Sequence, residues 1–373
     1  MTTNIHCPII HGGLQINLKS RANAVMFNHC CFRKEMQATP EINLWQDPRM
    51  IPLRELNDRN EWDPDCWHCQ GNELSGLTSF RSGMLDKFGI RKDLSGPVRL
   101  DLMIDTSCNL ACRICGPDAS TFWQKHYKEN NIPFIKDYDP EPKVDEMINI
   151  LRSLDLGNLE MLNWCGGETL MGKGYWRVLE TIADIVPHAK EKLMVSFQTN
   201  GTQTVDPQYY GLIEKFHLVR LQISLDGVGE RFNYQRWPAD WQQVTENILN
   251  LRNTLPSNIM FNIEETHSIF NLYYHDELVN WCKNNFSVDR KGDIINHVTH
   301  PVVGPFNLDN LTQEYVDAMQ SSDLRYLIKP EWRENPDEIR EMIAKIQQFD
   351  TIRGQDWCKT FTEVAEFYSR YLR

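Results

Sequence analysis

The chain has 373 residues and a formal net charge of −12, from 51 acidic and 39 basic side chains. This acidic balance argues against a broad phosphate-binding surface, so we do not expect nucleic acid to be the main partner. No apolar run approaches the length of a membrane span, and the N-terminal residues MTTNIHCPIIHGG lack the basic and apolar regions of a secretory signal. We therefore expect a cytoplasmic protein with no membrane partner.

Residues 1–97 form the first predicted region, which is irregular and rich in cysteine. The short apolar runs GLQINL (13–18) and NAVMF (23–27) predict a hairpin, and PRMIPLRELND (48–58) predicts a helical stretch. In a reducing cytosol, the chain's eleven cysteines are more often metal ligands or catalytic groups than disulfides. Eight of them precede residue 116: Cys7, Cys30, Cys31, Cys66, Cys69, Cys108, Cys112 and Cys115.

Strand and helix signals alternate from residue 98 onward. We predict strands at 98–105, 159–167, 192–201, 218–227, 259–266 and 293–300. We predict helices between and after them at 117–129, 143–154, 174–187, 207–216, 239–254 and 273–285. This alternation indicates parallel strands joined by crossover helices, and six units are too few for a closed barrel of eight.

The expected fold is therefore α/β, a partial (β/α)6 TIM-like barrel over residues 98–301. A small cysteine-rich α+β module (1–97) precedes it, and a helical C-terminal extension (302–373) caps it.

Unusual sequences follow the predicted strands where each strand ends. Cys108, Cys112 and Cys115 follow the first strand within DTSCNLACRICG. The later strand ends carry CGGE (165–168), Gln198 with Asn200, and Ser224 with Asp226. Because the carboxyl ends of parallel strands meet at one edge, we expect these residues to form a single site.

The three loop cysteines form a metal site that lacks one ligand. A structural zinc ion or a fully ligated four-iron cluster takes four ligands. Three thiolates can instead hold three irons of a [4Fe–4S] cluster and leave the fourth iron open to a substrate or cofactor.

The C-x-x-x-C-x-x-C spacing, with CGGE after the next strand, resembles the radical S-adenosylmethionine (SAM) superfamily over roughly residues 98–300. The resemblance implies an enzyme in which the amino and carboxylate groups of SAM bind the open iron. Reductive cleavage of SAM would then give a 5′-deoxyadenosyl radical, which abstracts a hydrogen atom from the substrate.

The resemblance also implies roles for the strand ends. Gly166, Gly167 and Glu168 match the segment that receives the methionyl ammonium group, and successive glycines let the backbone approach a ligand closely. Gln198 and Asn200 are placed to touch the methionine moiety.

Ser224 and Asp226 match the segment that reaches the methionine carboxylate and the ribose hydroxyls of SAM. A carboxylate that accepts hydrogen bonds from ribose is also found in dinucleotide sites. One departure from the family pattern is Ile114, where many members have an aromatic residue.

The N-terminal cysteines resemble the twitch module, a shorter relative of the SPASM module, which carries an auxiliary [4Fe–4S] cluster. In most relatives this module follows the barrel, whereas here it precedes it. The expected ligands are Cys7, Cys30, Cys66 and Cys69. Cys31 is the alternative to Cys30, because neighbouring side chains on an extended chain point to opposite sides.

A structural zinc site is the alternative for this module, since C-x-x-C pairs are common in zinc ribbons. In either case we expect Glu73, Ser79 and Arg81 to brace the loop around the C-x-x-C pair.

A cluster closed by four cysteines favours electron transfer from the substrate radical. The expected outcome is dehydrogenation or another modification of a small molecule or peptide, with a reductant such as flavodoxin or ferredoxin supplying the first electron. The alternative from another class is an iron–sulfur electron carrier without enzymatic activity.

Overall fold

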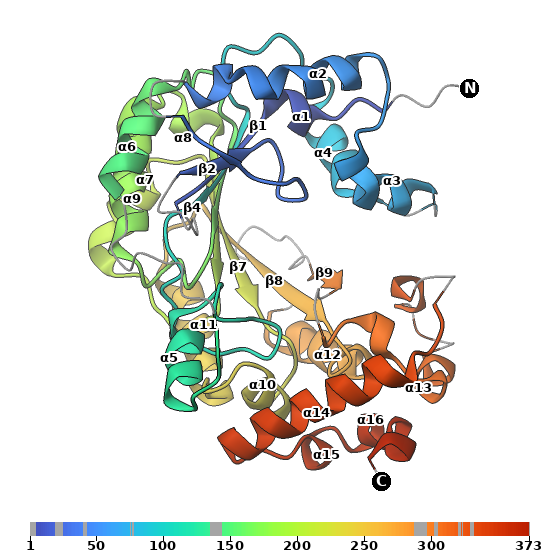
Figure 1. Ribbon diagram of the computed structural model, residues 1–373. Coiled ribbons are helices and arrows are strands. Elements are labelled where there is room, and N and C mark those ends of the chain that lie inside the picture. Colours follow the sequence, from blue (N-terminus) through green and yellow to red (C-terminus); the bar gives the residue numbers. More distant parts are fainter. Residues whose placement is uncertain are drawn as a thin grey trace. The chain divides into compact units, whose positions relative to one another are not determined.

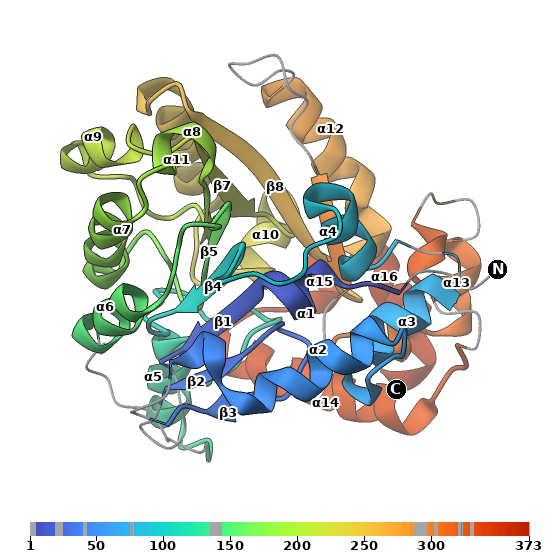
Figure 2. The same ribbon diagram turned by 90° about the horizontal axis from the view of Figure 1, so that it is seen from above.

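The computed structural model describes residues 5–18, 25–39, 43–74, 76, 78–134, 144–286, 297–301, 305–319, 322, 324–328 and 332–372. The chain folds into two compact units (Figures 1 and 2). The first contains Met1–Thr106, Ile135–Phe197 and Asp206–Arg220, and the second contains Ser107–Phe134, Gln198–Val205 and Leu221–Arg373. The units divide the chain at other positions than the segment boundaries expected from the sequence, so those boundaries remain a prediction.

The first unit is built on a mostly parallel sheet with the strand order β3-β2-β1-β4-β5-β6. Its strands are β1 (Gly13–Asn17), β2 (Met26–Asn28), β3 (Met36–Gln37), β4 (Arg99–Met103), β5 (Met161–Cys165) and β6 (Met194–Thr199). The predicted hairpin is confirmed, because β1 pairs antiparallel with β2.

Strand β1 also pairs in parallel with β4, with Gln15 opposite Asp101. The cysteine-rich segment therefore extends the sheet that the later strands form. All five residues of β1 are buried, which fits a strand covered on both faces.

The described part of the first unit also contains several helices. They are α1 (Pro8–Gly12), α2 (Ile51–Asp58), α3 (Trp67–Leu74), α4 (Phe80–Phe88), α6 (Val144–Ser153), α7 (Lys173–Ile185), α8 (Ala189–Lys192) and α9 (Tyr210–Ile213). In α7, Tyr175, Val178, Leu179 and Ile182 are buried at helical spacing. Helices α6, α7 and α9 lie side by side (Figures 1 and 2).

Strands β6 and β7 (Leu218–Ser224) run from the first unit into the second, where β8 (Ile259–His267) and β9 (His297–Pro301) follow in the strand order. Strand β9 pairs in parallel with β8, with Ile263 opposite His297. The helices of this unit are α5 (Thr121–Glu129), α10 (Glu230–Gln235), α11 (Trp241–Thr254), α12 (His275–Asn285), α13 (Gln313–Ala318), α14 (Pro336–Arg353), α15 (Trp357–Thr360) and α16 (Thr362–Phe367).

The C-terminal helices belong to the core of the second unit. Tyr234 of α10 and Phe270 after β8 pack in one buried cluster with Ile343 of α14 and Trp357 of α15. Helix α14 begins at an Asn335 cap, whose side chain accepts from two backbone N–H groups, and Gly354 in the left-handed conformation follows it.

The expected fold class is confirmed: the protein is α/β, with a mostly parallel sheet that forms an unclosed partial barrel. The first five predicted strands each overlap an observed one. The sixth is observed at 297–301, and its predicted start at 293–296 lies outside the described residues. In place of the helix predicted at 207–216, the structure has a 3-10 turn (Pro207–Tyr209) followed by the short helix α9. Helix α10 was not predicted. No helix in the described ranges is long and apolar enough to cross a bilayer.

Candidate functional site

The loop after β4 that carries the three cysteines is held by backbone hydrogen bonds within the second unit. The N–H groups of Ala111 and Arg113 donate to the carbonyls of Trp237 and Gln235, at 2.8 and 2.7 Å. The Trp123 indole of α5 donates to the Cys112 carbonyl at 2.9 Å. These contacts fix the loop on both sides of Cys112, so the thiols are positioned by the fold.

The three thiols differ in exposure. Cys112 is buried, Cys108 is half-buried and Cys115 is exposed. A hydrogen bond to Cys115, together with burial, raises the pKa of the Cys112 thiol, whereas the positive charge of Arg236 acts in the opposite direction. The same bond lowers the pKa of Cys115, which accepts it. The loop therefore offers three sulfur donors, two of them in mutual contact.

Arg236, which directly follows α10, brings a buried guanidinium to this loop. Its Nη1 lies 4.0 Å from the Cys112 sulfur, and its Nη2 lies 2.8 Å from Asp226 Oδ2. The Thr266 N–H donates to Asp226 Oδ1 at 3.0 Å. Burial raises the pKa of Asp226, while Arg236 opposes that shift. The predicted residue Asp226 thus lies near the cysteine loop and holds Arg236 there.

Asn200, at the end of β6, is placed as expected beside the cysteine loop. Its Nδ2 donates to Asn109 Oδ1 at 3.0 Å and lies 3.8 Å from the Cys108 sulfur. Thr202 joins this network by donating to Asn200 Oδ1 at 2.6 Å. Gln198 is exposed and Ser224 is half-buried, and their contact with SAM remains a prediction.

The GGE segment forms a tight turn after β5, within the first unit. Gly166 has a φ of 87°, and a Cβ there would lie 2.6 Å from the Asp105 carbonyl oxygen. Only glycine fits such a position. Glu168 is almost fully buried, and its Oε1 accepts from the Leu170 N–H at 3.1 Å. The segment therefore forms a turn that requires glycine at position 166, and its role toward SAM remains a prediction.

A buried ion pair ties the cysteine loop to α14. Arg113, between Cys112 and Cys115 in the sequence, donates to Asp350 Oδ1 at 2.5 Å, and its guanidinium also lies over the Tyr234 ring. The Tyr234 hydroxyl and the Trp357 N–H both donate to Asp350. The C-terminal extension thereby supports the loop that carries the three thiols.

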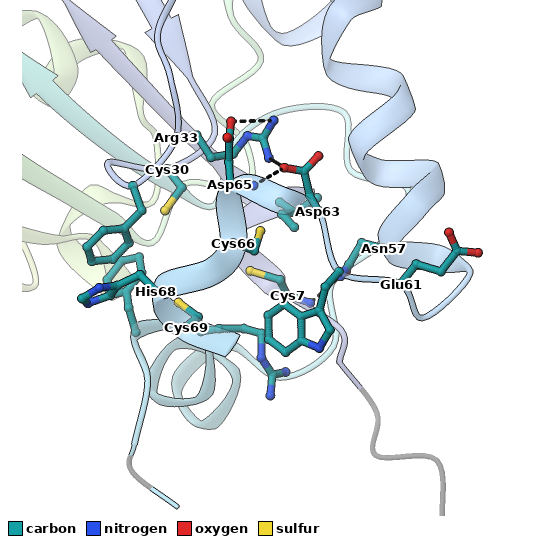
Figure 3. A pocket seen from close by; sticks show the side chains of 15 residues that line it. Cys7, Cys30, Arg33, Asn57, Glu61, Asp63, Asp65, Cys66, His68 and Cys69 are labelled. Atoms are coloured by element: carbon teal, nitrogen blue, oxygen red, sulfur yellow. Dashed lines mark hydrogen bonds and ion pairs between the residues drawn. The ribbon is translucent and has the colours of Figure 1, made fainter. Parts of the chain in front are cut away.

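The four predicted ligands of the N-terminal region line one pocket in the first unit, as Figure 3 shows. They are Cys7, Cys30, Cys66 and Cys69. Cys31 is exposed and is not among the residues that line the pocket. The structure therefore brings together the set expected from the sequence, with Cys30 rather than Cys31 facing the pocket.

Hydrogen bonds hold the segments that supply these cysteines. The Cys7 N–H donates to Asn57 Oδ1 of α2 at 2.9 Å, and Asn57 Nδ2 donates to the Ile5 carbonyl at 3.1 Å. Beside Cys66, Arg33 pairs with Asp63 at 2.5 Å and with Asp65 at 3.6 Å. The pocket is thus framed by α2 and by a charged pair that the sequence did not predict.

The brace expected around the C-x-x-C pair is confirmed. Arg81 donates to both carboxylate oxygens of Glu73, at 2.9 and 2.6 Å, and Ser79 also donates to Glu73. A further Arg81 nitrogen donates to the His6 carbonyl at 2.8 Å, next to Cys7 in the sequence. Arg81 therefore links the two ends of the ligand set.

Burial weakens the acidity of these thiols in the absence of a metal. It raises the pKa of Cys7 to about 11 and also raises the pKa values of Cys66 and Cys69. The pKa of Cys30 is also raised. The larger cause is its hydrogen bond with Cys31, and the second cause is burial. Backbone N–H groups of Ile9 and Ile10 act against the shift at Cys7. Four enclosed sulfur donors with nearby backbone donors fit a metal cluster.

Sequence reasoning missed the residues that surround the thiols. Arg236 lies 124 positions from Cys112, and Asp350 lies 237 positions from Arg113. No local spacing marks such partners, because arginine and aspartate are frequent and these contacts depend on tertiary folding.

Residues 104–270 match the family model described as the Radical SAM superfamily. A comparison with curated proteins finds no match for this chain. Among solved structures, native anSMEcpe with bound AdoMet is similar at 17% identity and a TM-score of 0.39, covering 69% of this chain and 62% of that one. SuiB from Streptococcus suis bound to S-adenosylmethionine is similar at 15% identity and a TM-score of 0.38, covering 82% and 58%. The chain thus spans less than two thirds of the length of either structure.

The matched range contains the three loop cysteines, the GGE turn, Asn200 and the Asp226–Arg236 pair. Residues 104–270 are therefore similar to a radical SAM domain.

Proposed function

We propose that the protein is a radical SAM enzyme that reductively cleaves S-adenosylmethionine and abstracts a hydrogen atom from its substrate. The observation that carries the proposal is the loop of the matched domain, which offers three sulfur donors and no fourth. Cys108, Cys112 and Cys115 would hold a [4Fe–4S] cluster with one open iron. When bound, this cluster and SAM supply a 5′-deoxyadenosyl radical.

The residues that the family resemblance assigns to SAM, together with Arg236, would bind and position these groups. Arg236 places a positive charge beside Cys112 and so offsets the negative charge of the thiolates. Asn200 and Glu168 would orient the methionine moiety, and Gly166 lets the backbone approach it. Asp226 would keep Arg236 in place, with Gln198, Gly167 and Ser224 as further contacts of SAM.

We further propose that Cys7, Cys30, Cys66 and Cys69 hold an auxiliary [4Fe–4S] cluster that accepts an electron from the substrate radical. The support for this proposal is that four cysteines from separate segments line one pocket. A structural zinc ion bound by the same four thiols is the alternative.

The reaction would then be a net two-electron oxidation of a small molecule or a peptide. A low-potential donor such as flavodoxin or ferredoxin would supply the electron that starts it. Because the chain carries a net charge of −12, nucleic acid is a poor candidate for the substrate. We place this activity in the cytoplasm.

The proposal is tested by anaerobic reconstitution with iron and sulfide, followed by reduction with dithionite in the presence of SAM. We expect 5′-deoxyadenosine in the wild type and none in Cys112→Ala, measured by liquid chromatography with mass spectrometry. Cys358→Ala is the matched control, because this thiol is half-buried and belongs to neither cysteine set. Intact clusters without 5′-deoxyadenosine in the wild type would rule out the enzyme and favour an electron carrier.

A further inference from the structure

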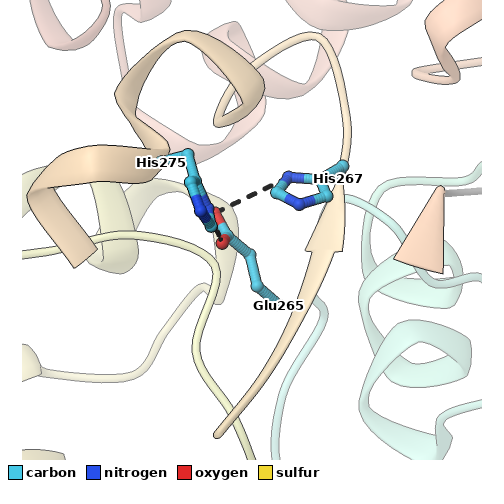
Figure 4. Close-up of side chains that lie close together, drawn as sticks. All are labelled: Glu265, His267 and His275. Atoms are coloured by element: carbon cyan, nitrogen blue, oxygen red, sulfur yellow. Dashed lines mark hydrogen bonds and ion pairs between the residues drawn. The ribbon is translucent and has the colours of Figure 1, made fainter. Parts of the chain in front are cut away.

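Three side chains at the end of β8 and the start of α12 could bind a metal ion. Their ligand atoms are nitrogen and oxygen, unlike the sulfur atoms of the two cysteine sets. Glu265 and His267 lie two residues apart on β8, so their side chains share one face of the strand. His275 is the first residue of α12. Figure 4 shows the carboxylate of Glu265 between the two imidazole rings.

The ligand atoms of these residues already lie close together. One nitrogen or oxygen from each of the three falls within 4.8 Å of the others. His275 Nδ1 is 2.7 Å from Glu265 Oε2, and His267 Nδ1 is 3.8 Å from Glu265 Oε1.

The group is buried. The side chains of Glu265 and His267 are 1% and 0% exposed, and that of His275 is 17% exposed. A bound cation would offset the negative charge of this buried carboxylate, and the two imidazoles can remain neutral and act as ligands.

The turn between the ligands is held rigidly. The Ser268 N–H donates to Asn271 Oδ1 at 2.7 Å, and Asn271 Nδ2 donates back to the Thr266 carbonyl at 3.0 Å. The Tyr315 hydroxyl accepts from the Tyr273 N–H and donates to the Ile269 carbonyl, at 3.0 and 3.1 Å. This frame fixes His275 relative to the strand end, which is the preorganisation that a metal site needs.

We propose that Glu265, His267 and His275 bind one divalent transition-metal ion, with zinc as the best match. Two imidazole nitrogens and one carboxylate are borderline donors that suit zinc, whereas calcium and magnesium require oxygen ligands. Three protein ligands leave a coordination position for water or for a substrate group, as in catalytic zinc sites.

This site is tied to the cysteine loop through one residue. Thr266, between the two strand ligands, donates its N–H to Asp226, which holds Arg236 beside Cys112. The metal would therefore stabilise the strand end on which Asp226 depends. The inference stands on these residues alone and does not require SAM cleavage.

The test uses the protein with its iron–sulfur sites filled, so that zinc does not occupy the thiols. Wild type and His275→Asn are equilibrated with zinc chloride and passed through a desalting column, and zinc and iron are measured by mass spectrometry. We expect about one zinc ion per chain in the wild type, a loss of most of it in the variant, and equal iron in both. Glu264→Gln, on the neighbouring position of the same strand, is the control that should retain zinc.

Equal zinc in wild type and His275→Asn, with equal iron, would overturn the proposal and leave a buried group in which His275 is hydrogen-bonded to Glu265 and His267 Nδ1 lies 3.8 Å from Oε1 of the same carboxylate. Zinc-edge X-ray absorption of the wild type gives a second readout that needs no variant. A shell of nitrogen and oxygen with imidazole scattering is expected, and a sulfur shell would contradict the site. The measurement of 5′-deoxyadenosine reports separately on the proposed enzyme, so the two failures are distinguishable.

Discussion

Arg236 brings a buried positive charge to the sulfur of Cys112, and Asp226 holds it there through a 2.8 Å ion pair. A cluster gains negative charge when it is reduced, so a nearby cation stabilises the reduced form. Arg236 is therefore placed to raise the reduction potential of the cluster that we assign to the loop.

The change Arg236→Leu tests this role. We expect the midpoint potential to fall by roughly 40 mV or more, since about 1 kcal/mol of charge stabilisation corresponds to that shift for one electron. Arg236→Lys keeps the charge and should recover part of the difference. The potential is measured by redox titration followed by electron paramagnetic resonance. Equal potentials in the wild type and the leucine variant would show that the guanidinium has only a structural role.

At this scale the sequence predicts the three cysteines and Asp226 as site residues, but not the contacts that Arg236 makes with them. Cys108, Cys112 and Cys115 were identified because their spacing is local and unusual. Arg236 and Asp226 are ten residues apart, but the contact with Cys112 forms only when the loop and α10 fold together. A single sequence carries no sign of that contact.

Helix α14 shows how a distant element supports the loop. Its Asp350 accepts from Arg113 and Tyr234 and from the Trp357 N–H, so one carboxylate joins the cysteine loop, α10 and α15. Arg113 is fully buried. Its charge depends on this carboxylate, because a buried unpaired ion is costly.

We expect Asp350→Asn to lower the free energy of unfolding by about 3 kcal/mol, because it leaves Arg113 buried without its counter-charge. The variant should also retain less iron in the loop cluster. The control on the same helix is Asp337→Asn, since the Asp337–Arg340 pair is exposed and should contribute almost nothing. Urea denaturation followed by circular dichroism measures both. An equal decrease in the free energy of unfolding in the two variants would contradict a special role for Asp350.

The elements themselves were largely predictable. Apolar residues predict β4 to β8, in a nearly continuous buried run in β6 and in an alternating pattern in β7. The parallel pairing of β1 with β4 was not predicted, since the two strands lie about 80 residues apart and register depends on tertiary contacts. Helix α10 was missed because its six residues, ERFNYQ, are too few to show a helical period.

At the scale of the whole molecule, the two sets of cysteines belong to different compact units. Cys7, Cys30, Cys66 and Cys69 lie in the first unit, with their supports Asn57 and Arg81 in that same unit. The three loop cysteines and their supports Arg113, Arg236 and Asp350 lie in the second. Each set is therefore held by contacts inside its own unit, and the two clusters that we propose should assemble independently.

This independence is tested by removing one ligand of the N-terminal set. The wild type reconstituted with iron and sulfide should contain about eight irons per chain, as expected for two four-iron clusters. Cys66→Ala should lose about half of this iron, because the three remaining pocket cysteines cannot close the cluster. It should still form 5′-deoxyadenosine in the presence of SAM, since the loop cysteines are untouched. Product formation from the substrate should stop if the auxiliary cluster accepts the electron.

The matched control is Cys31→Ala, which removes an exposed thiol that does not line the pocket. We expect its iron content to equal that of the wild type, because Cys30 supplies the ligand from the Cys30–Cys31 pair. Iron loss in Cys31→Ala would reverse that assignment. Loss of all iron in Cys66→Ala would contradict independent assembly. About four irons in the wild type, with a zinc ion whose X-ray absorption shows a sulfur shell, would replace the auxiliary cluster with a zinc site.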